Sequence, residues 1–314
     1  MVLIQSLIIN FLVIFLFLQI GNFFSNKFKL EEYYEKILFG FSIFTLLNFF
    51  FYFVFYFSVK KIIFIWIITL VCIFFSNIFY SRKINFIKFG LSVSKFIIPI
   101  TIIYILIPIF FGEQFYVFRG NHWDLFSYLS IASLFNDITF NNILSNEIPR
   151  YYLHFENIEK ISISRPITSF LLGVFLNLKN IDIYLLVYLF KLFFVILTSM
   201  SIYLFFNKIN ISRLKSFFFS LIFSLSFWII YIFEIDALSH LVSMPIFILI
   251  ISEMINIDNN IKSKNNLFIT YFAIINSALF LIYPEIFIIS SLIVLICLIV
   301  GFLKNKLFLK DYIF

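Results

Sequence analysis

The chain has 314 residues, of which 63% are hydrophobic and only 12% are charged. A soluble domain cannot use so much apolar surface, because too few polar residues remain to cover it. The formal net charge of +7 could indicate nucleic-acid binding, but the basic residues are scattered singly between apolar runs, which is typical of membrane topology signals, and this interpretation takes precedence. The composition therefore predicts a lipid bilayer as the chain's surroundings and no nucleic acid as its partner.

Apolar stretches long enough to cross a hydrocarbon core of about 30 Å, which takes about 20 helical residues, recur along the chain. They are Val2–Ile20, Ile37–Ser58, Ile62–Tyr80, Lys95–Phe111, Ile183–Phe206, Lys215–Phe233, Leu238–Ile255, Leu267–Tyr283 and Ile286–Leu303. Helices are required, because backbone groups in lipid must be paired within their own segment and no stretch alternates as barrel strands do. We therefore predict an all-α polytopic membrane protein of about nine transmembrane helices.

The predicted helices fall into two parts around a polar loop. Residues 1–94 are expected to form an N-terminal three-helix extension, and residues 95–314 the membrane core. The loop at 113–180 is expected to contain short interfacial helices. One of them is Pro166–Leu178, which is apolar but too short to span a bilayer.

Basic residues in the short connections predict the orientation of the chain in the plasma membrane. If Pro166–Leu178 does not cross the membrane, almost all of the basic connections lie on the same side of it. Only Lys60 and Lys61 then lie on the opposite side. The N-terminus and the large loop are then outside, and the C-terminus is cytoplasmic.

Asp124 and Tyr128 are candidates for a site in the outer loop. They are four residues apart in WDLFSYLSIA and share one face of the predicted helix. Two roles are open for Asp124. In the structural role, it lies in the first turn of a helix capped by Asn121, where a carboxylate complements the helix dipole. In the functional role, it is a catalytic carboxylate.

Arg165 and Glu285 are candidates for substrate binding. Arg165 precedes Pro166 at the start of the interfacial segment. Its guanidinium either binds a phosphate through bidentate hydrogen bonds or extends to the membrane interface as a snorkelling side chain. Glu285 follows Tyr283-Pro284 at the end of a span. It either faces the same cavity as Asp124 or is an ordinary turn carboxylate.

Lys191 is a further candidate, because it lies near the middle of the fifth predicted span, where a charge is costly. It either meets a lipid phosphate or pairs with a carboxylate in the bundle. Glu234, Asp236 and His240 form a small cluster that is a weak candidate for a divalent metal ion, since no dense ligand motif accompanies it.

The order of these features resembles the GT-C class of polyprenyl-phosphate-sugar-dependent glycosyltransferases, which includes the protein mannosyltransferases and the lipid A aminoarabinose transferases. The resemblance covers roughly Lys95 to Leu303 and rests on WDLFSYLSIA, on Arg165-Pro166 in SRPITSFLLGVFLNL, and on Tyr283-Pro284-Glu285. It implies that Asp124 is the general base and that Arg165 holds the departing phosphate of the donor. The later spans and outer C-terminal domain of that class are missing, so a short or truncated member is expected.

Two other classes of function stay open at this point, a transporter or flippase and a non-catalytic membrane scaffold. The stretches predict no paired broken helices, no inverted repeat and few intramembrane charges apart from Lys191, which disfavours a transporter. A transferase requires Asp124, Arg165 and Glu285 to converge on one outward cavity. A transporter instead places its polar residues near the bilayer midplane.

Overall fold

The computed structural model describes residues 2–28, 30, 32, 33–79, 85–110, 123–144, 166–177, 182–234, 237–255 and 266–305. Within these ranges the chain is helical and contains no strand. The helices are α1 (Val2–Phe28), α2 (Tyr33–Phe49), the π-helical turn η1 (Phe50–Val54), α3 (Val59–Phe79), α4 (Phe86–Phe110), α5 (Trp123–Asp137), α6 (Phe140–Leu144), α8 (Pro166–Leu176), α9 (Ile183–Lys208), α10 (Arg213–Ser224), α11 (Phe227–Glu234), α12 (Leu238–Met254), α14 (Asn266–Ile282) and α15 (Pro284–Asn305).

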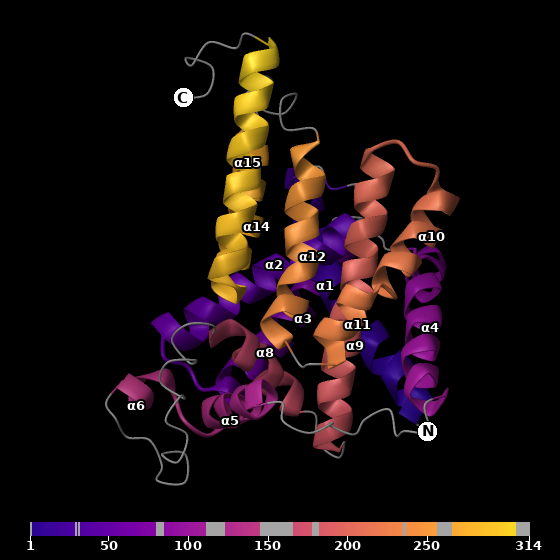
Figure 1. The fold of residues 1–314 in the computed structure, drawn as a ribbon. Coiled ribbons are helices and arrows are strands. Elements are labelled where there is room, and N and C mark those ends of the chain that lie inside the picture. The colour runs from indigo at the N-terminus through magenta and orange to yellow at the C-terminus, as the bar shows by residue number, and fades with distance from the viewer. Residues whose placement is uncertain are drawn as a thin grey trace.

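The long helices form a bundle with two distinct ends (Figure 1). At the lower end of the view lie α5, α6 and α8, together with the first residues of α1 and α9. At the upper end α9 is joined to α10, and α15 ends there. We refer to these as the lower end and the upper end.

Five of the described helices are long and apolar enough to cross a membrane. They contain Leu7–Ser25, Tyr33–Val54, Val59–Asn77, Phe86–Leu106 and Ile183–Lys208, and α10 with α11 makes a sixth span if this bent pair counts as one. The shorter apolar helices are α8, α12, α14 and α15. The prediction of an all-helical chain with several candidate membrane spans is thus confirmed, but the described residues contain five or six such spans and not nine.

The sixth predicted stretch, Lys215–Phe233, is not one continuous helix. It breaks between α10 and α11, whose axes differ by 43°. Neither proline nor glycine occurs at the break. Instead the Tyr104 hydroxyl of α4 donates a hydrogen bond to the Ser224 carbonyl over 2.8 Å, and a side chain that bonds to a helix carbonyl in this way can interrupt the helix.

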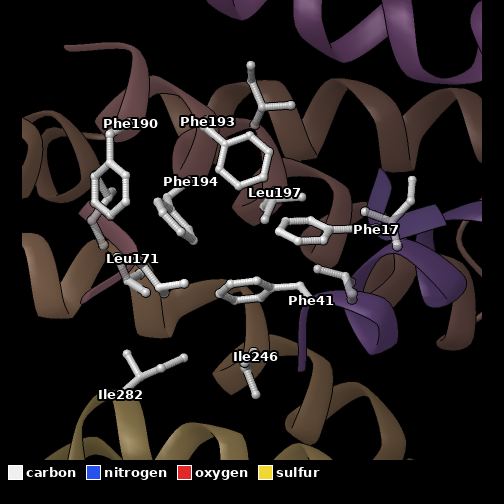
Figure 2. Packing of buried hydrophobic residues seen from close by; sticks show 14 of the residues in the cluster. Phe17, Phe41, Leu171, Phe190, Phe193, Phe194, Leu197, Ile246 and Ile282 are labelled. Atoms are coloured by element: carbon white, nitrogen blue, oxygen red, sulfur yellow. The ribbon is translucent and has the colours of Figure 1, made fainter. Parts of the chain in front are cut away.

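Helix α9 is the centre of the bundle, and every residue from 185 to 204 is buried. Figure 2 shows how the phenylalanines of α9 meet those of α1 and α2 in the core. The ring of Phe17 lies 5.8 Å from that of Phe193, and the ring of Phe41 lies 5.4 Å from that of Phe194. Lipid is as apolar as these side chains, so close van der Waals packing rather than exclusion from water holds such helices together.

Two glycines allow α1 and α2 to pack with their backbones in close contact. A Cβ atom added to Gly21 would lie 1.8 Å from the carbonyl oxygen of Lys36, and one added to Gly40 would lie 2.0 Å from that of Phe17. Small residues at such crossings are typical of membrane helix pairs. No other residue type fits at these two positions without moving a helix.

Helix α8 is short, as predicted for the interfacial segment Pro166–Leu178, but its surroundings differ from that prediction. Every residue from 167 to 173 is buried, because α8 packs against α3, α5, α9, α12 and α14. A helix that lies in the interface would keep one face in contact with water or lipid headgroups. Over these residues α8 is instead an internal helix of the lower end.

Candidate functional site

Three helices of the lower end are joined by a buried chain of hydroxyl groups. The Tyr128 hydroxyl on α5 lies 2.6 Å from the Ser239 hydroxyl on α12, which in turn donates to the Thr168 hydroxyl on α8 over 3.3 Å. Tyr128 is 5% exposed, Ser239 1% and Thr168 0%. Tyr128, a residue selected from the sequence, therefore lies where α5, α8 and α12 meet.

A second polar contact connects α12 to the turn between α14 and α15. The Tyr283 hydroxyl lies 3.1 Å from Nε2 of His240, with the two ring centroids 4.6 Å apart. Glu285 follows two residues later as an exposed residue in the first turn of α15. The predicted residues His240 and Glu285 thus belong to the same end of the bundle as Tyr128.

Helices α5 and α8 are also held together by side-chain amides. The amide nitrogens of Asn136 and Asn177 both donate to the Gly173 carbonyl, over 3.1 and 2.9 Å. Asn177 also donates to the Asn136 side-chain oxygen over 2.8 Å. A Cβ atom on Gly173 would lie 3.0 Å from the Ala132 carbonyl, so glycine permits this close approach.

For Asp124 and Arg165, the two residues expected to carry the chemistry, the structure describes only the helices to which they belong or which they precede. Asp124 is the second residue of α5, but its side chain lies outside the described part of the chain, and so does all of Arg165. Helix α8 begins at the residue after Arg165. The helices that flank both candidates therefore pack against each other, and the convergence of the two side chains remains a prediction.

An apolar groove runs beside this polar end. It has a volume of about 290 Å³ and lies between α1, α2, α3, α8 and α9. Leu171 and Phe175 of α8 form one wall, and Leu16 and Ile67, which are 38% and 57% exposed, form the rim. The groove therefore leads from the lipid-facing surface to the helix that begins after Arg165.

Lys191 is buried in α9, with 6% of the residue exposed. Its ammonium donates to the Phe233 carbonyl over 3.0 Å and lies 4.4 Å from the centroid of the Phe233 ring. Phe233 is in the last turn of α11, where carbonyls have no partner within the helix and a cation complements the helix dipole. This contact gives Lys191 a clear role in fixing the lower end of α11.

The proposed metal cluster gains no support from the described residues. Glu234 is exposed at the end of α11, His240 contacts Tyr283, and Asp236 lies outside the described residues. In the described ranges no three histidine, cysteine, aspartate or glutamate side chains are grouped so that they can hold a metal ion. We assign no metal role to these residues.

Sequence reasoning missed the polar groups of the upper end. Lys208 at the end of α9 lies 3.1 Å from Glu35 of α2 and 2.7 Å from Glu253 of α12. The signal was present in the sequence, because Glu253 lies inside the predicted span Leu238–Ile255, and a carboxylate within such a span needs a partner.

Comparisons with protein-family models, with curated proteins and with solved structures found no match to this chain. The geometry therefore supplies the evidence for function.

Proposed function

We propose that this protein is a membrane glycosyltransferase that moves a sugar from a polyprenyl-phosphate donor to a lipid, glycan or protein acceptor. In this proposal the lower end faces the outside of the plasma membrane, the C-terminus is cytoplasmic, and the chain crosses the bilayer about nine times. The observation that carries the proposal is the position of the apolar groove, which reaches from the lipid-facing surface to α8.

The groove suits the isoprenoid chain of such a donor. Its lining is almost entirely aliphatic and aromatic, and its exposed rim at Leu16 and Ile67 lets a lipid chain enter from the bilayer. The groove contacts α8 at Leu171, Val174 and Phe175, and we propose that the donor phosphate lies beyond the groove, where Arg165 would bind it. A guanidinium binds phosphate through paired, charge-assisted hydrogen bonds.

Asp124 is the proposed general base. The acceptor hydroxyl oxygen attacks the anomeric carbon of the sugar, the bond from that carbon to the phosphate oxygen breaks, and the hydroxyl proton passes to the carboxylate. Support comes from the packing of α5, which carries Asp124 in its first turn, against α8 and α12 through Tyr128, Ser239 and Thr168. Tyr128 acts here as a positioning residue for α5.

The test is sugar transfer by the purified full-length protein in liposomes supplied with labelled polyprenyl-phosphate sugars. Asp124→Asn should lower the rate at least about 100-fold, because general-base catalysis contributes roughly that factor or more. Asp137→Asn, an equal loss of charge at the exposed C-terminal end of the same helix, is the matched control and should keep the wild-type rate. Transfer undiminished in Asp124→Asn would exclude the base assignment.

One observation favours a transporter as a second candidate. Broken helices line the binding sites of many transporters, and α10–α11 is a broken span whose lower end bonds to the buried Lys191. Solute uptake into liposomes that is lost in Lys191→Met, together with no sugar transfer by the wild type, would support this alternative. Activity in neither assay would favour the non-catalytic scaffold.

A further inference from the structure

A polar pocket of about 700 Å³ opens at the upper end, where the first turns of α2 and α10, the N-terminal part of α4 and the C-terminal part of α9 meet. Its charged lining consists of Glu32, Lys36, Lys88, Lys95 and Arg213. The pocket therefore combines four cationic side chains with a single carboxylate among the described residues. Such an excess of positive charge in a concave site attracts anions.

Lys95 is the central cation of the pocket. Its ammonium lies 4.3 Å from the ring centroid of Tyr203 and 5.4 Å from that of Tyr34, and the rings of Phe96 and Phe217 are within 5.8 Å. The aromatic faces hold the ammonium in place without neutralising it. Within the described ranges, neither Lys95 nor Arg213 forms an ion pair with a carboxylate.

Two helices direct their N-termini to this pocket. Tyr33 and Tyr34 begin α2, Arg213 and Leu214 begin α10, and all four line the pocket. The side chains of the two N-cap residues, Glu32 and Ser212, accept no hydrogen bond from the helices that they precede. The backbone N–H groups of both first turns are therefore not capped by these two residues, and helix N-termini of this kind bind anions such as phosphate.

The border of the pocket indicates where the anion comes from. Leu214 of α10, which lines the pocket, is 68% exposed, and Ile87 and Leu91, which neighbour the lining residues Lys88 and Ser92 in α4, are 78% and 69% exposed. In a membrane-spanning bundle these side chains face acyl chains, and they stand next to Lys88 and Arg213. A headgroup in the pocket can therefore keep its acyl chains in the bilayer, whereas a soluble anion would gain nothing from this apolar border.

We propose that this pocket binds the phosphate of a lipid headgroup with net negative charge, held by Lys95, Arg213 and the N-terminal amides of α2 and α10. The pocket lies at the opposite end of the bundle from α5 and α8, so the proposal is independent of the sugar transfer proposed above. It predicts a lipid that remains bound to the protein and ties α4, α9 and α10 together at the upper end.

The experiment measures lipid binding to the purified full-length protein in detergent by native mass spectrometry. The probes are phosphatidylglycerol, phosphatidylcholine with the same acyl chains, and inorganic phosphate. Wild type should bind phosphatidylglycerol in preference to phosphatidylcholine, and Lys95→Met and Arg213→Gln should each weaken that binding roughly tenfold or more, the expected effect of losing a charged hydrogen bond. Lys60→Gln, which removes an exposed lysine at the first turn of α3, is the control and should bind as the wild type does.

Arg213 is exposed, so Arg213→Gln should fold even if Lys95→Met does not, and its thermal midpoint verifies this. Equal affinity for the two lipids, or phosphatidylglycerol binding unchanged in Arg213→Gln, would overturn the proposal. Displacement of phosphatidylglycerol by inorganic phosphate at matched concentration would also overturn it, because the pocket would then select a soluble anion.

Discussion

Lys208, the last residue of α9, donates a hydrogen bond to Glu253 of α12 across 2.7 Å. The same ammonium lies 3.1 Å from Glu35 in the first turn of α2, and the Tyr271 hydroxyl of α14 donates to the same Glu253 oxygen over 2.9 Å. The side chains of Lys208 and Glu253 are only 17% and 8% exposed. One cation thus joins three helices directly and a fourth through a tyrosine.

Lys208→Met should destabilise the protein strongly, because it leaves two carboxylates close together without the cation between them. Removing one partner of a buried ion pair costs about 3–5 kcal/mol. The measurement is the thermal unfolding midpoint in detergent, with Lys60→Met, which removes an exposed lysine, as the control. The double variant Lys208→Met/Glu253→Gln should recover part of the loss, and an unchanged midpoint in Lys208→Met would contradict the role of this network.

Alanine at Gly21 or Gly40 should separate α1 from α2. The added methyl group would meet a backbone carbonyl at 1.8 Å or 2.0 Å, and overpacking of this kind costs about 1–3 kcal/mol or more. Gly90→Ala is the matched control on α4, where nothing lies within 4 Å of the new atom. There the higher helix propensity of alanine should raise stability by up to about 1 kcal/mol. Midpoints that fall equally in all three variants would contradict the role of Gly21 and Gly40 in the close contact between α1 and α2.

Tyr128 and Ser239 should show a measurable coupling. Tyr128→Phe and Ser239→Ala each remove one side of a buried 2.6 Å hydrogen bond, and such bonds between membrane helices contribute roughly 0.5–2 kcal/mol. A double-mutant cycle on unfolding free energies isolates this term. Tyr231→Phe paired with Ser239→Ala is the control, since Tyr231 is exposed on α11, and that pair should be additive. Additivity in the Tyr128 pair as well would mean that the hydrogen bond adds no stability.

Glu32, which precedes α2, should make stability depend on pH. Burial raises the pKa of its carboxyl above 4.5 and Glu35 raises it further, while Arg213, Lys208 and Lys95 act in the opposite direction. The native state therefore holds this proton more tightly than the unfolded chain does. The stabilisation is complete below the unfolded pKa of about 4.5, and it is lost as the pH rises through the raised pKa.

Glu32→Gln removes this dependence and leaves the other titrating groups in place. The midpoint of Glu32→Gln relative to the wild type should therefore rise as the pH increases from about 4, near the ordinary carboxyl pKa, through the raised pKa of Glu32. The readout is the difference between the two midpoints at each pH, in which contributions from groups common to both proteins cancel. A difference that stays constant as the pH rises from about 4 would contradict the effect of burial on the pKa of Glu32.

The lower end shows how far the residues of a candidate site can be selected from a sequence. Tyr128, His240 and Glu285 were selected from separate stretches, and the structure brings them to one end of the bundle. The hydrogen bonds of Ser239 and Thr168 could not be predicted from the sequence. A single hydroxyl in an apolar helix is common, and its partner lies far away in the chain. The roles of Asp124 and Arg165 stay predictions.

The sequence by itself determined that this chain is helical and suited to a membrane, because backbone groups in lipid must pair within each apolar segment and segment length decides what can cross. Only the tertiary structure decided that α8 is internal, that α10 and α11 are separate, and that Lys208 meets Glu253. These features depend on which residues far apart in the chain become neighbours. Helix packing in lipid is decided by shape, at glycines such as Gly21 and Gly40, and by sparse polar contacts, and neither leaves a periodic pattern in the sequence.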